Sequence, residues 1–104
     1  MKLWFSRDKD ISIRDQLTTQ LMLGIVTGEL QPGVRLPSTR ALARRFRLHP
    51  NTVSAAYRQL EQQRWVESVR GSGVYVRADS KDLREARMET LDRLALDFVR
   101  SARR

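Results

Sequence analysis

The chain of 104 residues contains no cysteine and a single histidine, His49. The absence of thiols excludes a disulfide framework and any thiolate metal site. His49 has no second histidine and no carboxylate cluster beside it, so the sequence offers too few ligands for a metal ion. We therefore expect neither a metal nor a cofactor.

Long apolar runs are absent as well. No stretch approaches the roughly 20 apolar residues that a helix needs to span a membrane. The first residues, Met1–Asp8, lack the apolar region of a signal peptide. These two absences predict a cytoplasmic protein that does not act at a membrane.

Groups that carry catalysis are equally scarce. The sequence has no glycine-rich phosphate-binding loop and no metal-ligand spacing of histidine and glutamate. One histidine and no cysteine leave little for nucleophilic or acid–base chemistry. We expect a protein that is not an enzyme.

Negative charge is scarce in one segment of the chain. Residues 35–77 hold nine arginines, no lysine and only two acidic residues, Glu61 and Glu67, whereas residues 1–34 carry equal numbers of basic and acidic groups. The formal net charge of +8 therefore lies mostly on one segment. Such a concentration of arginine favours a nucleic-acid partner over a merely soluble basic protein.

Apolar side chains recur every four residues near the N-terminus, which predicts a helix from about Ile13 to Thr27. Ser12 is its expected N-cap and Gly28 its expected C-terminal stop. The recurring apolar positions are Leu17, Leu21 and Ile25. Before this helix we expect an extended lead-in, with Trp4 and Phe5 folded back on the core.

Two short helices joined by a tight turn are predicted next. The first begins after the N-cap Ser38, and the second begins at Pro50, where the missing N–H has no cost. The turn between them is Arg47–His49. Their expected buried positions are Leu42, Ala43 and Phe46 on the first helix, and Val53, Ala56, Tyr57 and Leu60 on the second. This is the pattern of a helix-turn-helix that presents its second helix to DNA.

A β-hairpin is predicted directly after these helices. Trp65–Val69 and Val74–Arg77 are short β-prone runs, and residues 70–73 form the tip between them. Glycines at the tip permit a positive φ and a close approach to a phosphate backbone. A hairpin in this place is a wing, and Trp65 at its start is expected in the core rather than stacked on a base.

The C-terminal residues predict one more helix, over 81–103, with Ser80 as its N-cap. It would be roughly 35 Å long and could not bury its apolar stripe on so small a domain, which favours a homodimer contact. The expected dimerisation residues are Leu83, Leu91, Leu94, Ala95 and Phe98. The predicted fold is mainly α with a small β-hairpin: a winged helix-turn-helix over 1–78, followed by a helical dimerisation arm over 79–104.

Five motifs between Ile13 and Val76 identify a family resemblance. They are Gly28–Gly33 (GELQPG), Leu36–Ala43 (LPSTRALA), Asn51–Val53 (NTV), Ala56–Glu61 (AYRQLE) and Gly71–Val76 (GSGVYV). Together they resemble the DNA-binding domain of the GntR family of bacterial transcription regulators, and are most similar to its YtrA subfamily. The resemblance implies a winged helix-turn-helix homodimer that binds a palindromic operator in double-stranded DNA, usually as a repressor.

The resemblance also implies roles for individual residues. It places base reading on Arg40, and recognition-helix contacts on His49, Pro50, Asn51, Thr52 and Ser54. It places the wing-tip role on Arg70, Gly71, Ser72 and Gly73. Other branches of the family often carry arginine where this chain has Pro50 and Ser54, so their operator sequences do not transfer to it.

Side-chain chemistry supports DNA contacts at several of these positions. An arginine such as Arg40 can donate two hydrogen bonds to guanine, and Asn51 and Thr52 can reach a base edge or a phosphate. Arg35 and Ser38 suit a phosphate at a helix N-terminus. For each, the alternative is a solvated or helix-capping side chain.

Two further positions leave a choice open. The ring of Tyr57 is expected in the core, and its hydroxyl either contacts the DNA backbone or makes no DNA contact. Arg58 either pairs with a phosphate or is solvated. The complete predicted DNA-contact set is Arg35, Ser38, Thr39, Arg40, His49, Pro50, Asn51, Thr52, Ser54, Tyr57, Arg58, Arg70, Gly71, Ser72 and Gly73.

Alternative functions stay open at the level of sequence. A basic winged helix can also bind nucleic acid without sequence preference, as an architectural protein, or bind RNA. The same domain precedes a pyridoxal-phosphate-binding domain in MocR-type regulators, of which this chain would be a fragment. The charge-balanced last segment and its Arg103-Arg104 ending favour a complete short regulator instead. The sequence identifies no small-molecule effector.

Overall fold

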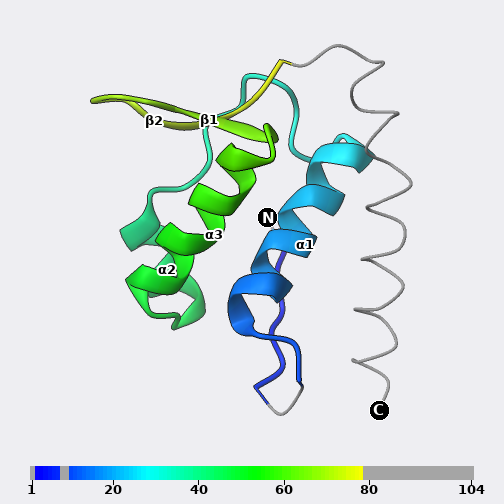
Figure 1. Cartoon of the computed structure of the whole chain (residues 1–104), viewed down its shortest axis with the longest axis vertical. Coiled ribbons are helices and arrows are strands. Elements are labelled where there is room, and N and C mark those ends of the chain that lie inside the picture. The colour runs from blue at the N-terminus through cyan, green and yellow to red at the C-terminus, as the bar shows by residue number, and fades with distance from the viewer. Residues whose placement is uncertain (1, 8–9, 79–104) are drawn as a thin grey trace.

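The computed structural model describes residues 2–7 and 10–78, which form three helices and a two-stranded antiparallel hairpin. The elements are α1 (Ile13–Thr27), α2 (Thr39–Phe46), α3 (Pro50–Gln62), β1 (Val66–Val69) and β2 (Gly73–Val76). This is the architecture of a winged helix, with the hairpin at one end of the helical layer (Figure 1). The predicted arm over 79–104, with its five dimerisation residues, lies outside the described residues.

The caps of α1 explain its bounds, which confirm the prediction. The Ser12 hydroxyl accepts a hydrogen bond from the Asp15 N–H at 3.1 Å and so satisfies one free donor of the first turn. At the other end Gly28 adopts a left-handed conformation, with φ of 87°. Glycine takes this conformation without the Cβ clash that other residues suffer, and the helix stops there.

The helix-turn-helix follows the same local logic. The Ser38 hydroxyl accepts from the Ala41 N–H at 3.1 Å and starts α2 as predicted. Arg47, left-handed with φ of 55°, ends that helix. The Leu48 N–H donates to the Ala43 carbonyl at 2.8 Å, which buries Leu48 inside the turn. The chain then turns directly into α3 at Pro50.

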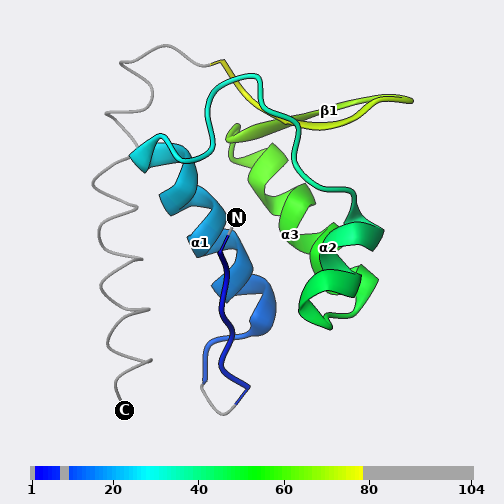
Figure 2. The ribbon, with the colours of Figure 1, turned by 180° about the vertical axis from the view of Figure 1, so that it is seen from behind.

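The core lies where α1, α2, α3 and the base of the hairpin meet (Figure 2). Burying such apolar side chains supplies most of the stability of a small domain. Among them are the fully buried residues Leu17, Leu21, Leu42, Val53, Leu60, Val66 and Val76. Trp65 is 6% exposed and belongs to this core, as predicted, whereas Phe46 is only partly buried.

The hairpin differs from the prediction in the start of its second strand and in an additional pairing on the far side of that strand. β1 pairs with β2 in the register Val66↔Val76, and the β2 strand begins at Gly73, one residue before its predicted start. On the other side of β2, the Leu36 N–H donates to the Val74 carbonyl and the Val76 N–H to the Val34 carbonyl, both at 2.8 Å. The segment entering α2 therefore pairs with β2 through one isolated antiparallel bridge, Arg35↔Tyr75, which ties the wing to the helix-turn-helix.

Two glutamines hold the N-terminal segment against α1. The Gln16 amide accepts from the Ser6 N–H and donates to the Ser6 carbonyl, each at 2.8 Å. The Gln20 amide does the same with Trp4, at 3.1 and 2.7 Å. Residues four apart on a helix are spaced much like residues two apart on an extended chain, so the pair substitutes for a partner strand.

The same extended conformation corrects one prediction. Alternate residues of an extended chain point to opposite sides, and here Leu3 and Phe5 pack on the core. Phe5 meets Phe46 edge to face, with 5.9 Å between the ring centroids. Trp4 therefore faces outward and is 52% exposed, so its predicted place on the core is wrong.

Candidate nucleic-acid interface

The two sides of α3 have different surroundings. Its buried side carries Val53, Ala56, Tyr57 and Leu60, each no more than 5% exposed. At 3.6 residues per turn, Asn51, Ala55 and Arg58 lie on the opposite side. Asn51 and Arg58 are exposed and Ala55 is half-buried. The side chains on this outward side are short near the start of the helix, and none of them is acidic. A helix that enters a DNA groove needs both features, because it must approach the base edges closely and must not repel the phosphates.

The start of α3 is fixed by His49, which the sequence placed in the turn and among the recognition-helix contacts but did not identify as the N-cap. The His49 Nδ1 accepts a hydrogen bond from the Asn51 N–H at 3.0 Å, so the imidazole is the N-cap of the helix. An accepting Nδ1 places the proton of the neutral ring on Nε2. The exposed ring is therefore held at the helix start with an N–H donor directed away from the cap.

The first turn of α2 carries the predicted contacts Ser38, Thr39 and Arg40. Ser38 uses its hydroxyl oxygen as the N-cap acceptor, which leaves its proton available to an outside acceptor. Arg40 is exposed and Thr39 half-buried. Arg40 has no acidic partner among the described residues, so its guanidinium is able to bind an anion or a base edge.

Tyr57 joins α3 to the entry of α2. Its hydroxyl donates to the Pro37 carbonyl at 2.7 Å, and burial raises the pKa of this hydroxyl, which keeps it a neutral donor. Its proton therefore already has a partner within the chain. Of the two roles that the sequence left open for Tyr57, the structure supports the one in the core.

One face of the wing gathers Arg35, Gly73 and Tyr75. Arg35 pairs with Tyr75 across an antiparallel bridge. A Cβ on Gly73, whose φ is 142°, would lie 2.8 Å from the Arg35 Nε, so the arginine side chain crosses the strand where only glycine leaves room. The Ser72 and Tyr75 hydroxyls are hydrogen-bonded to each other. Sequence reasoning missed Tyr75, whose signal is its alternation with the apolar Val74 and Val76.

The tip of the wing is open. Arg70 and Gly71 are exposed, and Gly71 has a φ of 78° with no atom near the place of a Cβ. On β1, the Ser68 N–H donates to the Glu61 carboxylate at 2.7 Å, and hydrogen bonds from the Ser68 side chain and backbone lower the pKa of Glu61. The bond links α3 to β1 and gives one of the few acidic groups of the segment a partner within the chain.

The predicted contacts thus fall on three parts that the core holds together: the entry and first turn of α2, the stretch of α3 from its N-cap His49 to Arg58, and the wing (Figure 1). Arg35, Arg58 and Arg70 are exposed and have no acidic partner among the described residues. The arrangement is therefore an electropositive surface with small polar groups beside the arginines. In the described part of the chain no helix is long and apolar enough to cross a bilayer.

Comparisons with known proteins agree with this geometry. The family described as "Bacterial regulatory proteins, gntR family" matches residues 13–76. The HTH-type transcriptional repressor YtrA of Bacillus subtilis is 38% identical over 90 residues, which are 82% of this chain and 69% of that protein.

Solved structures give the same result. A GntR family transcriptional regulator from Listeria monocytogenes has a TM-score of 0.76 and 29% identity, covering 91% of this chain and 82% of that one. The AraR DNA-binding domain in complex with operator ORX1 has a TM-score of 0.63 and covers 73% of this chain and 95% of that one. At 22% identity the AraR likeness shows the fold alone.

Proposed function

The chain belongs to the GntR family of bacterial regulatory proteins, whose members are transcription regulators rather than enzymes, and on that premise we propose that it is a repressor. In this proposal it binds a palindromic operator in double-stranded DNA as a homodimer. The observation that carries the proposal is the outward side of α3 with Asn51, Ala55 and Arg58, together with Arg40 of α2 and Arg70 of the wing tip, which have no acidic partner among the described residues.

Each element has a part in the proposed complex. The start of α3 enters the major groove, where Asn51 and Thr52 reach base edges or phosphates. Arg40, from the first turn of α2, donates two hydrogen bonds to a guanine, a pairing worth about 1–3 kcal/mol of discrimination. The wing tip at Arg70 and Gly71 follows the adjacent backbone, which positions the domain without reading sequence.

Two relatives support this reading. The AraR domain, which shares the fold, is in complex with its operator, and the relative from Bacillus subtilis is named a repressor. Repression follows physically when a bound protein occupies a promoter that polymerase needs. The charge of residues 35–77 supports a polyanionic partner independently of the relatives.

The homodimer is proposed from the apolar stripe of residues 79–104. A two-fold dimer would place its recognition helices on half-sites about 34–36 Å apart, or closer if the domains pack tightly. Replacing Leu94 and Phe98 by aspartate is expected to give monomers in sedimentation velocity. A dimer that survives both changes would exclude this segment as the main interface.

The test is selection of bound duplexes from a random-sequence library, followed by sequencing. A two-fold symmetric consensus is the expected result. Arg40→Ala should then bind that consensus less tightly while its affinity for random DNA changes little. Strong binding with no enrichment would instead favour a nonspecific or architectural nucleic-acid-binding protein, and equal losses on both duplexes would refute base reading by Arg40.

A further inference from the structure

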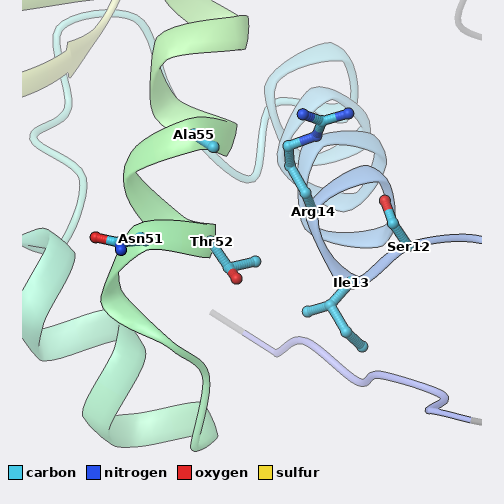
Figure 3. A pocket seen from close by; sticks show the side chains of 6 residues that line it. All are labelled: Ser12, Ile13, Arg14, Asn51, Thr52 and Ala55. Carbon is cyan, nitrogen blue, oxygen red and sulfur yellow. The ribbon is translucent and has the colours of Figure 1, made fainter.

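A pocket of about 400 Å³ lies between the start of α1 and the outward side of α3. Ser12, Ile13 and Arg14 line it from α1, and Asn51, Thr52 and Ala55 line it from α3. Figure 3 shows Ala55 and Thr52 of α3 across the space from Arg14 and Ile13 of α1, with the Thr52 side chain directed toward the α1 side. The α1 residues belong to none of the motifs that predicted DNA contacts.

The lining of this pocket has two chemical parts. Ile13, Ala55 and the methyl group of Thr52 form an apolar part, while the Arg14 guanidinium and the hydroxyls of Ser12 and Thr52 supply donors. A sugar–phosphate unit of DNA has the same two parts, because deoxyribose is largely apolar and the phosphate carries a full negative charge. The lining therefore fits a DNA backbone better than it fits a purely apolar or purely anionic ligand.

Among the described residues, Arg14 and Ser12 keep donors that are able to bind a ligand in the pocket. The Arg14 Nε lies 3.7 Å from the Asp15 Oδ1, beyond an ordinary hydrogen bond, and both side chains are about half exposed. An exposed ion pair of this kind contributes little to stability, so a phosphate competes with it easily. The Ser12 hydroxyl accepts from Asp15, and among the described residues its proton has no acceptor.

We propose that this pocket binds one sugar–phosphate unit of the DNA strand bordering the groove that α3 enters, with Arg14 as the phosphate ligand. The inference rests on the proposed DNA-binding function and adds to it a contact on the α1 side of the recognition helix. Arg40 stands on α2, a different neighbour of α3. A duplex would then be held from both flanks of the recognition helix, which fixes the angle at which α3 enters the groove.

The test compares Arg14→Ala with the charge-matched control Arg44→Ala, which changes an exposed arginine of α2 that does not line the pocket. Both are titrated against a random duplex and the selected duplex at several salt concentrations. Arg14→Ala should weaken binding to both duplexes by a similar factor, roughly five- to tenfold. It should also lower the salt slope by about 0.9, the value for one lost phosphate contact.

Single phosphates of the selected duplex are then replaced by neutral methylphosphonates. With the parent protein, one linkage per half-site should weaken binding by about the same factor as Arg14→Ala. With Arg14→Ala that penalty should disappear, whereas with Arg44→Ala it should persist. Arg14→Lys should restore part of the affinity, and an unchanged thermal midpoint of each variant excludes unfolding as the cause.

Two outcomes separate this inference from the function on which it rests. If Arg14→Ala behaves like Arg44→Ala, or if every methylphosphonate penalty survives in it, the pocket is not a backbone site although operator binding stands. If the parent protein binds no duplex even at low salt, the proposed function and this inference fall together.

Discussion

The buried and the outward faces of α3 have opposite compositions although they share the same 13 residues. The buried face offers large apolar side chains with almost no exposed surface, such as Val53 and Leu60. The outward face offers small or polar groups, Asn51, Ala55 and Arg58. The buried face stabilises the packing of the domain core. The outward face is small enough to fit into a groove of DNA. Stability and recognition therefore divide by helical face rather than by segment, and substitutions on the two faces are expected to have separable effects.

The largest effect is expected on the buried face. Leu60 is completely buried, so Leu60→Ala removes apolar contacts and leaves a cavity. The free energy of unfolding should fall by about 2–5 kcal/mol, which is a large part of the stability of a small domain. Urea denaturation followed by circular dichroism measures it. A loss below about 1 kcal/mol would show that this face is not the main support of the fold.

Tyr57 tests the boundary between the two faces. Tyr57→Phe keeps the ring and removes the hydroxyl that donates to the Pro37 carbonyl. The expected cost is about 1–2 kcal/mol of unfolding free energy, because a partly buried acceptor loses its partner. Affinity for the selected duplex, measured where the variant is folded, should change by less than about twofold. A larger loss of affinity at unchanged stability would assign the hydroxyl to DNA after all.

A substitution at Ala55 on the outward face is expected to lower DNA affinity and to leave stability unchanged, the reverse of the result expected at Tyr57. Ala55→Leu adds volume on the surface that is proposed to enter the groove, and leucine is almost as good a helix former as alanine. The pocket beside Ala55 gives the larger side chain room, so stability should stay within about 0.5 kcal/mol. Affinity for DNA should fall about tenfold, equivalent to ~1.4 kcal/mol. Fluorescence anisotropy with labelled duplex measures the loss, and unchanged affinity would place the DNA elsewhere.

The smallest effect is expected at Glu61, which connects α3 to the wing through Ser68. Hydrogen bonds from Ser68 lower the pKa of this carboxyl in the folded state, so its contribution is present above the unfolded pKa and disappears as pH falls through the folded value. The group is exposed, which limits the contribution to less than about 0.5 kcal/mol. Glu61→Gln should therefore narrow the stability difference between pH 7 and pH 3 slightly. If the unfolding free energy of the variant depends on pH as strongly as that of the parent, the bond between Glu61 and Ser68 does not contribute to stability.

Much of the fold was predictable because its signals are local. The bounds of α1, the caps Ser12, Gly28 and Ser38, and the start of α3 at Pro50 all depend on residues within one helical turn of each other. The hairpin followed from two β-prone runs on either side of a glycine-containing tip. The DNA contacts on α2, α3 and the wing stay predictions, which the family resemblance and the side-chain chemistry of these positions supplied together.

What the sequence by itself determined is therefore which residues form helices, where those helices end and which side of each is apolar, because hydrogen bonds and periodicity over a few residues set these features. The tertiary structure alone decided the bridge between Arg35 and β2, the Gln16 and Gln20 contacts with the N-terminal segment, and the bond from Tyr57 to Pro37 across 20 positions. It alone placed Arg14 opposite Ala55. Such contacts join residues far apart in the chain, and no local preference encodes them; they exist only once burial of the shared core has fixed how the helices cross.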